Sequence, residues 1–116
     1  MRHFVRSFVH AARGVLFTFK NERNFQVEVG VACALILAML WLPLSTVENM
    51  LLILAMTSVL ALELINTALE RVMDILKPRV HPYARVVKDV TAGAVFVVSL
   101  GALILGLVIL LPYFLQ

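Results

Sequence analysis

Long apolar stretches alternate with short polar ones along this chain, and three of them are candidates for membrane spans. Neither Lys nor Arg occurs between residues 24 and 70 or between 89 and 116. A helix that crosses a bilayer needs about 20 mainly apolar residues, so the first interval has room for two spans and the second for one. The pattern predicts transmembrane helices over residues 27–42, 50–69 and 90–111. Because the first is short, we expect part of the preceding helix to continue it.

The first 22 residues show a different pattern, with basic and apolar side chains on opposite faces of a helix. His3 and His10 share the basic stripe. The other basic members are Arg2, Arg6, Arg13 and Lys20, and the facing aromatic residues are Phe4, Phe8 and Phe19. A basic amphipathic helix of this kind lies in the membrane interface. We therefore predict a surface helix over residues 1–22.

A turn is expected between the first two spans, in the sequence LPLSTVEN at 42–49. Pro43 cannot continue a helix interior, and Ser45 or Thr46 can cap the helix that follows, with Glu48 in its first turn. The first two spans therefore form a tight helical hairpin.

Composition and charge fix the class of protein and its orientation. The 116 residues are 62% hydrophobic with a mean hydropathy of +0.99, which is typical of one integral membrane domain, 1–116, of all-α class. All ten Lys and Arg residues precede the first span or lie between the second and third. Because basic residues are retained in the cytoplasm, the N-terminus and a 71–88 loop are predicted to be cytoplasmic. The 43–48 turn and the C-terminus then face outward.

Acidic residues inside the second span are the main functional clue. Glu63, Asn66, Thr67 and Glu70 are spaced by three and four residues, so they share one helix face. At about 1.5 Å per residue, Glu63 lies roughly 10 Å deeper than Glu70. A charge at that depth costs about 2.5–3.5 kcal/mol unless it is paired or faces water. Such a group suits a general base or a proton carrier, and the alternative is that Glu63 and Asn66 only join helices through hydrogen bonds.

Other charged residues gather at the cytoplasmic boundary. Lys88 and Asp89 follow a turn expected at His81-Pro82, and Glu22, Glu70 and Asp74 reach the same level. Alternatively, Lys88 extends to lipid headgroups, Asp89 complements a helix dipole and Glu22 is only a solvated charge. Mg²⁺ commonly uses one or two protein carboxylates together with substrate phosphates. The boundary is therefore a candidate site for Mg²⁺ and a phosphate.

Three motifs resemble the signatures of the prokaryotic diacylglycerol kinase family, which includes the undecaprenol kinases. They are NERNFQVEV at 21–29, ELINTALE at 63–70 and VKDVTAGAV at 87–95, and the resemblance covers nearly the whole chain. It implies a homotrimeric helical bundle of three-span subunits that transfers the γ-phosphate of ATP to a lipid hydroxyl at the cytoplasmic interface. The absence of a GxxxxGK sequence is consistent with that family.

The resemblance also implies roles for individual residues. Glu63 would be the general base, with Asn66 positioning it, and Glu63 and Ala92 would meet the lipid. Glu22 and Glu70 would bind Mg²⁺. The implied contacts of ATP are His10, Glu22, Glu70, Arg79, His81, Lys88 and Asp89. A basic contact near the N-terminus of the family corresponds here to His3, which departs from the pattern.

The acceptor and the broader alternatives remain open at this stage. ERNF at 22–25 and HPYAR at 81–85 resemble the undecaprenol kinase branch more than the diacylglycerol kinase branch, so undecaprenol is the expected acceptor. The family resemblance implies an enzyme of the bacterial cytoplasmic (inner) membrane. A second hypothesis is a small proton-coupled transporter with Glu63 as carrier, although the outer half of the spans offers only hydroxyls such as Ser58 and Ser99. A third is an accessory subunit that packs through small residues, which would leave the boundary charges without a shared purpose.

Overall fold

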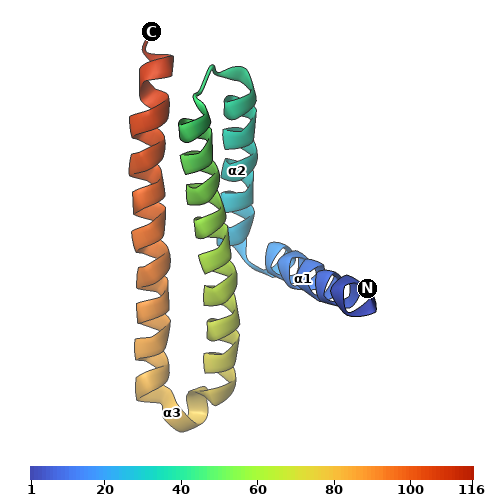
Figure 1. Cartoon of the computed structure of the whole chain (residues 1–116). Coiled ribbons are helices and arrows are strands. Elements are labelled where there is room, and N and C mark those ends of the chain that lie inside the picture. Colours follow the sequence, from blue (N-terminus) through green and yellow to red (C-terminus); the bar gives the residue numbers. More distant parts are fainter.

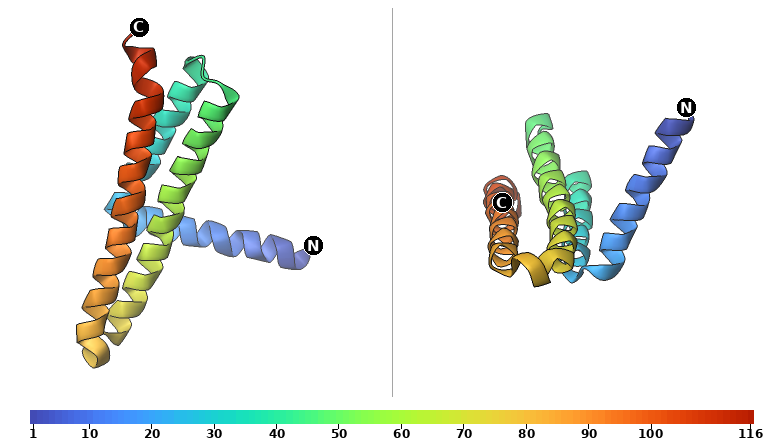
Figure 2. Two further views of the ribbon diagram at one scale, coloured as in Figure 1. Left: turned by 60° about the vertical axis from the view of Figure 1, so that its left-hand side comes forward. Right: turned by 90° about the horizontal axis from the view of Figure 1, so that it is seen from below.

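The computed structural model of the chain is a membrane-type helical bundle with one helix projecting from its side (Figure 1). The structure describes residues 1–76 and 82–116. Its elements are α1 (Arg2–Asn21), α2 (Arg23–Trp41) and α3 (Thr46–Phe114). The described parts of α3 form two arms, Thr46–Leu76 and Pro82–Phe114, which run side by side in opposite directions. Two further views show α1 leaving the bundle at a steep angle (Figure 2).

The predicted fold class is confirmed in the described residues. Every element there is helical, and three segments are long and apolar enough to cross a membrane, namely Arg23–Trp41, Thr46–Leu76 and Pro82–Phe114. The amphipathic N-terminal helix is also present, as α1. The homotrimer stays a prediction.

The turn between α2 and α3 forms for the predicted reason. Ser45 caps α3, since its Oγ accepts a hydrogen bond from the Glu48 amide at 3.1 Å. In return, Glu48 Oε1 accepts from the Ser45 amide at 2.9 Å, which completes a capping box. Glu48 also accepts a hydrogen bond from the Tyr113 hydroxyl at 2.6 Å, so the same carboxylate joins the turn to the far end of α3.

The predicted loop over 71–88 is wrong in extent. The first arm stays helical through Leu76 and the second is helical from Pro82. The arms contain 31 and 33 residues. At about 1.5 Å per residue each exceeds 45 Å, whereas the hydrocarbon core of a bilayer is about 30 Å thick. Charged residues therefore mark where the chain leaves the membrane, and the helices continue past that level.

The expectation that the preceding helix continues the first span is also corrected. Glu22 has φ −116° and ψ 114°, an extended conformation that ends α1 and begins α2. α2 gains its length from Arg23 onward instead. The junction is stabilised by side chains: Gln26 Nε2 donates to the Phe19 carbonyl at 2.7 Å, and Asn21 Nδ2 donates to the Phe17 carbonyl at 2.8 Å. The Phe19 carbonyl lies in the last turn of α1, where a helix leaves its carbonyls without a partner, and Gln26 supplies the missing donor.

Candidate active site

Glu63 lies on the first arm of α3 in a buried position. It is 5% exposed, and Thr67, one turn away, is 4% exposed. Thr67 directs its hydroxyl to the Glu63 carbonyl at 2.9 Å, so it does not occupy the Glu63 carboxylate. Other carboxylates interact electrostatically with that of Glu63, namely Glu22, Glu28 and Glu70. The structure therefore gathers acidic groups from α2, α3 and the α1–α2 junction around one buried carboxylate.

Asn66 and Glu70 occupy the same helix face, nearer the end of the arm. Asn66 Nδ2 donates a hydrogen bond to Glu70 Oε1 at 3.1 Å. The other amide atom, Asn66 Oδ1, is buried and has no hydrogen-bond partner within the described residues. An acceptor oxygen without a donor, beside a carboxylate, is a position where a cation can bind, because a cation needs oxygen ligands and brings no competing acceptor.

The Glu22 carboxylate reaches the same region from the junction of α1 and α2. Its Oε1 accepts from Arg71 Nη2 at 2.9 Å, and its side chain is 26% exposed. Arg71 follows Glu70 directly on the first arm, so this ion pair attaches the junction beside the Asn66–Glu70 pair. Arg71 also places its guanidinium over the ring of Phe17 on α1, 5.5 Å from the ring centroid. Three segments of the chain thus meet at Arg71.

Lys88 on the second arm faces the first arm. Its Nζ lies 2.7 Å from Asp74 Oδ1, and this ion pair is partly exposed. Lys88 also interacts electrostatically with Glu70. The pair therefore places one cation and one carboxylate between the two arms.

Other predicted site residues are not drawn into this cluster by the single chain. His10 lies in a shallow hollow lined by α1 residues. Asp89 and Ala92 are exposed on the second arm, and His3 is exposed on α1. Arg79 and His81 lie outside the described residues, as does part of the turn expected at His81-Pro82.

The donor set fits Mg²⁺ only in combination with phosphates. Among residues 1–76 and 82–116, no three His, Cys, Asp or Glu side chains gather into a metal-binding group. The two candidate carboxylates, Glu22 and Glu70, and the unpartnered Asn66 Oδ1 are oxygen ligands, which hard cations prefer. Mg²⁺ needs no complete protein cage, because it keeps waters and binds substrate phosphates. The residues present therefore suit a metal that arrives with a nucleotide.

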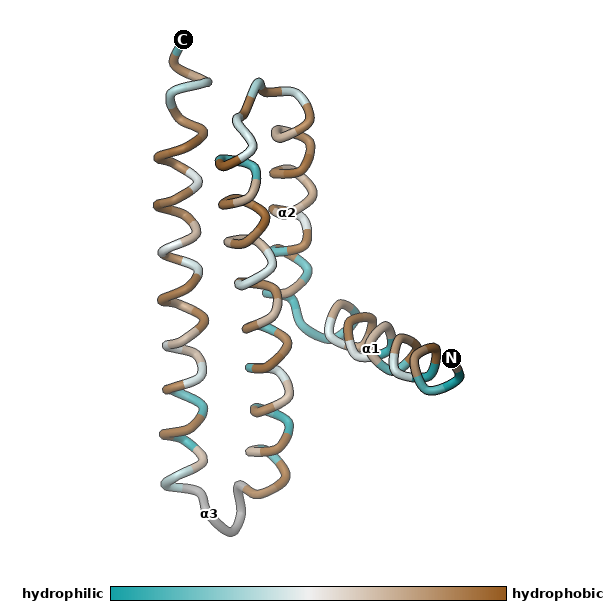
Figure 3. Tube along the Cα trace, in the orientation of Figure 1, coloured by the Kyte–Doolittle hydropathy of each residue, from teal (hydrophilic) through white to brown (hydrophobic). Residues whose placement is uncertain are grey.

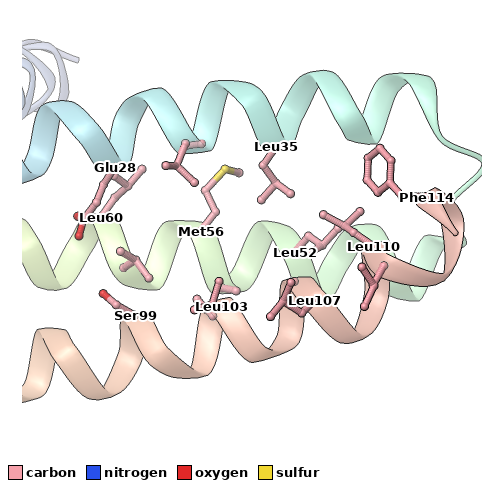
Figure 4. Close-up of a pocket in the computed structure, with 17 residues that line it drawn as sticks. Glu28, Leu35, Leu52, Met56, Leu60, Ser99, Leu103, Leu107, Leu110 and Phe114 are labelled. Atoms are coloured by element: carbon pink, nitrogen blue, oxygen red, sulfur yellow. The ribbon is translucent and has the colours of Figure 1, made fainter.

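A groove of about 500 Å³ runs along the bundle between α2 and both arms of α3. Figure 4 shows Glu28 and Ser99 near one end and Phe114 at the other, with apolar side chains between them. Glu28 Oε2 and Ser99 Oγ are buried and have no hydrogen-bond partner in the described part of the chain. Since Glu28 interacts with Glu63, the polar end of the groove is close to the buried carboxylate. The groove suits a hydrocarbon chain with a polar group at that end.

Sequence reasoning did not identify several residues that shape this region. Arg71 was counted only as a basic residue near the membrane, although it joins three segments. Glu28 and Ser99 were not recognised as facing one groove. The two arms run antiparallel with Lys88 opposite Asp74, and this register places Ser99 opposite Glu63. Glu28 interacts with Glu63, so Glu28 and Ser99 lie at a similar depth.

Polar and apolar residues separate along the bundle in the way that an interfacial site requires. Figure 3 shows hydrophilic positions concentrated at the α1–α2 junction and toward the ends of the arms near residues 76 and 82, whereas the opposite half is mostly hydrophobic. The fold and the site define an integral membrane protein with an acidic and basic cluster at one boundary and an apolar groove below it.

Comparison with known proteins identifies the family. Residues 9–110 match the family model described as prokaryotic diacylglycerol kinase. The undecaprenol kinase of Bacillus subtilis (strain 168) is 41% identical over 112 residues, which cover 97% of this chain and 91% of that protein. The diacylglycerol kinase of Haemophilus influenzae is 33% identical over 97 residues, covering 84% and 82%. That of Synechocystis sp. is 38% identical over 107 residues, covering 91% of this chain and 61% of the relative.

This chain belongs to the prokaryotic diacylglycerol kinase family. It is therefore an enzyme of the lipid kinase class, as the resemblance implied. Family membership separates this hypothesis from the transporter and the accessory subunit, which the residues alone had left open.

Proposed function

We propose that this chain transfers the γ-phosphate of ATP to the hydroxyl of undecaprenol at the cytoplasmic face of a bacterial inner membrane. The observation that carries the proposal is the buried Glu63 carboxylate, seven residues before Glu70, the partner of Asn66, on the same arm. This spacing separates a hydroxyl-binding level from a phosphate-binding level by about 10 Å along the helix. The relative named undecaprenol kinase, 41% identical over nearly the whole chain, supports this acceptor.

The residues divide the work according to their depth. Glu63 accepts the proton of the lipid hydroxyl as the hydroxyl oxygen forms a bond to the γ-phosphorus. Asn66 helps to position the site, and its Nδ2 donates a hydrogen bond to Glu70 Oε1. The bond between the γ-phosphorus and the bridging oxygen breaks, which releases ADP. Glu22 and Glu70 would hold Mg²⁺, which when bound would neutralise charge on the phosphate oxygens. Lys88 exchanges Asp74 for a phosphate oxygen and offsets the remaining negative charge.

The other contacts of the proposal require a second copy of the chain. His10, Arg79, His81 and Asp89 are assigned to ATP and Ala92 to the lipid, in sites between the subunits of a homotrimer. His10 lies in a hollow that α1 alone lines, and Asp89 and Ala92 are exposed. Such residues are available to a neighbouring subunit. The apolar groove accommodates the hydrocarbon part of the acceptor, whose hydroxyl then lies near Glu28 and Glu63.

Orientation follows from charge. The N-terminus and the 71–88 region, which carry all the basic residues, are cytoplasmic, and the C-terminus faces outward. ATP then approaches from a side that attracts polyanions, while the lipid enters laterally.

Diacylglycerol is the second candidate acceptor, and one observation favours it. The unpartnered Ser99 hydroxyl at the polar end of the groove can donate a hydrogen bond to an ester carbonyl. Diacylglycerol has such carbonyls, whereas undecaprenol has its hydroxyl as its one polar group. Several relatives are named diacylglycerol kinase.

An acceptor panel tests the proposal. The purified protein is offered undecaprenol and diacylglycerol in matched lipid vesicles with Mg·ATP, and phosphorylated lipid is quantified. We expect a higher kcat/KM for undecaprenol, because specificity reflects the difference in transition-state binding. A higher value for diacylglycerol would reverse the acceptor, and no transfer to either lipid would remove both.

A further inference from the structure

Arg71 occupies a position that none of the assigned roles explains. It extends from the first arm of α3, pairs with Glu22 at the α1–α2 junction and stacks over Phe17 of α1. Its Nη2 is 2.9 Å from Glu22 Oε1, and Phe17 lies 5.5 Å away, measured from the guanidinium carbon to the ring centroid. The Arg71 side chain is half exposed, at 50%. One guanidinium therefore links the surface helix, the junction and the bundle.

The ion pair between Arg71 and Glu22 engages one of the two carboxylate oxygens of Glu22. The hydrogen bond from Arg71 uses only Oε1 of Glu22, so the pair does not use the second oxygen, Oε2. A carboxylate that binds a metal through one oxygen is commonly oriented by a hydrogen bond to the other. The planar guanidinium suits this task, because it fixes the direction of the bond as well as supplying charge.

The positive charge of Arg71 lies beside an acidic region. Glu22 and Glu70 each interact electrostatically with the buried Glu63. A positive charge at Glu22 offsets the repulsion between its carboxylate and that of Glu63. Arg71 is the cation that the structure places directly on Glu22.

We propose that Arg71 is a positioning residue of the metal site, holding Glu22 through Oε1 so that Oε2 faces the cation, and anchored in turn by the ring of Phe17. The inference rests on the proposed role of Glu22 as a Mg²⁺ ligand. It also connects metal binding to the surface helix, since α1 carries Phe17 and Glu22 is its C-cap residue. Phe17 of α1 contacts Arg71, and Arg71 contacts the proposed metal ligand.

The test measures metal affinity rather than turnover. Mn²⁺ is titrated into the full-length protein in detergent with a saturating non-hydrolysable ATP analogue, and free Mn²⁺ is followed by electron paramagnetic resonance. Loss of an outer contact to a metal ligand typically weakens affinity by about 10- to 100-fold, which is the change expected for Arg71→Ala. Arg71→Lys keeps the charge without the planar fork, so we expect an intermediate loss.

Two further variants separate positioning from general effects. Phe17→Leu removes the ring but keeps an apolar side chain, and we expect a loss of about 2- to 5-fold, in the range of an exposed cation–π contact. Arg85→Ala removes the same charge from the other arm, and its Mn²⁺ affinity is expected to match that of the unaltered protein. Equal losses in Arg71→Ala and Arg85→Ala would reduce the effect to net charge and overturn the inference.

The variant Glu22→Gln separates the positioning role of Arg71 from the proposed role of Glu22 as a metal ligand. If Glu22→Gln weakens Mn²⁺ binding and Arg71→Ala leaves it unchanged or tighter, the positioning role of Arg71 fails while the metal ligand stands. If Glu22→Gln has no effect, the ligand assignment itself fails. Thermal unfolding followed by circular dichroism is the check that each variant is folded. If Arg71→Ala is misfolded, the Mn²⁺ affinity of the folded Arg71→Lys decides the outcome.

Discussion

Asn66 donates a hydrogen bond to Glu70 across one helical turn, with Nδ2 3.1 Å from Oε1, while its own Oδ1 has no donor among the described residues. The amide thus orients a carboxylate and presents an oxygen to the same space. Both features fit the site proposed above for a cation and its nucleotide.

The first prediction concerns this pair. Asn66→Ala removes the hydrogen bond that orients Glu70, so we expect the Mg²⁺ concentration for half-maximal activity to rise by about 10- to 100-fold. The measurement is a Mg²⁺ titration of phosphate transfer at saturating ATP. Asn49→Ala is the matched control, because Asn49 also has a buried, unpartnered Oδ1 but lies in the first turn of α3, beyond the site. A similar rise in both variants would contradict the prediction.

The second prediction concerns the base. Glu63→Gln keeps the size of the side chain but cannot accept the proton, and general-base catalysis contributes about 10²- to 10⁴-fold. We expect kcat to fall by that factor, measured with radiolabelled ATP. Glu48→Gln is the control, since Gln can replace Glu in a capping box and Glu48 is at the other end of the arm. Full activity in Glu63→Gln would exclude Glu63 as the base.

Lys88 is expected to act on the phosphates after leaving Asp74. Removing one pre-positioned charge contact to a transition state costs about 10²- to 10³-fold in kcat, which we expect for Lys88→Ala. Single-turnover kinetics with Mg·ATP measure the effect on transfer itself. Lys20→Ala removes an equal charge from α1 and serves for comparison. If the two lysine variants behaved alike, Lys88 would contribute only to the overall attraction of ATP.

Ser99 provides a test of acceptor recognition. Its unpartnered hydroxyl lines the polar end of the groove, where an ester carbonyl can accept from it. A hydrogen bond contributes about 0.5–1.5 kcal/mol, so Ser99→Ala is expected to lower kcat/KM for diacylglycerol by about 2- to 12-fold. The value for undecaprenol is expected to stay the same. Equal losses for both lipids would mean that Ser99 acts on the shape of the groove.

The last prediction concerns Tyr113, where a substitution is expected to change stability and leave activity unchanged. Tyr113→Phe removes the 2.6 Å hydrogen bond to Glu48 at the end of the bundle opposite the site. We expect a lower thermal midpoint in detergent and an unchanged kcat, because the lost contact joins the α2–α3 turn to the end of α3. Ser58→Ala, which removes a hydroxyl bonded only within its own helix, is the comparison. A loss of activity at unchanged stability would show that the far end influences the chemistry.

Much of the fold was predictable because its signals are local. Three apolar segments, the Ser45 cap and the break at Pro43 depend on residues within one or two turns of each other. The ends of the arms were not predictable in this way. Arg71, Asp74 and Lys88 resemble loop residues in a hydropathy pattern, yet they lie on helices that extend beyond the membrane, where one ion pair joins the two arms.

The site likewise contains some residues that local spacing predicts and others that only the folded chain brings together. The shared face of Glu63, Asn66 and Glu70 follows from helical spacing alone. Arg71 and its partner Glu22 are 49 residues apart, and their pairing requires the junction to bend at Glu22. No Gly or Pro marks that bend. Its clearest trace in the sequence is the polar pair Asn21 and Gln26, whose side chains bind carbonyls at the end of α1.

The bend at Glu22 has a consequence for how the bilayer acts on the enzyme. The predicted placement of α1 in the membrane surface makes the angle between α1 and α2 the angle between that surface and the first span. That angle is set by the backbone of the residue whose carboxylate is proposed to bind the metal. A change in that angle would therefore move the proposed ligand, so the orientation of α1 and the binding of the metal would be coupled.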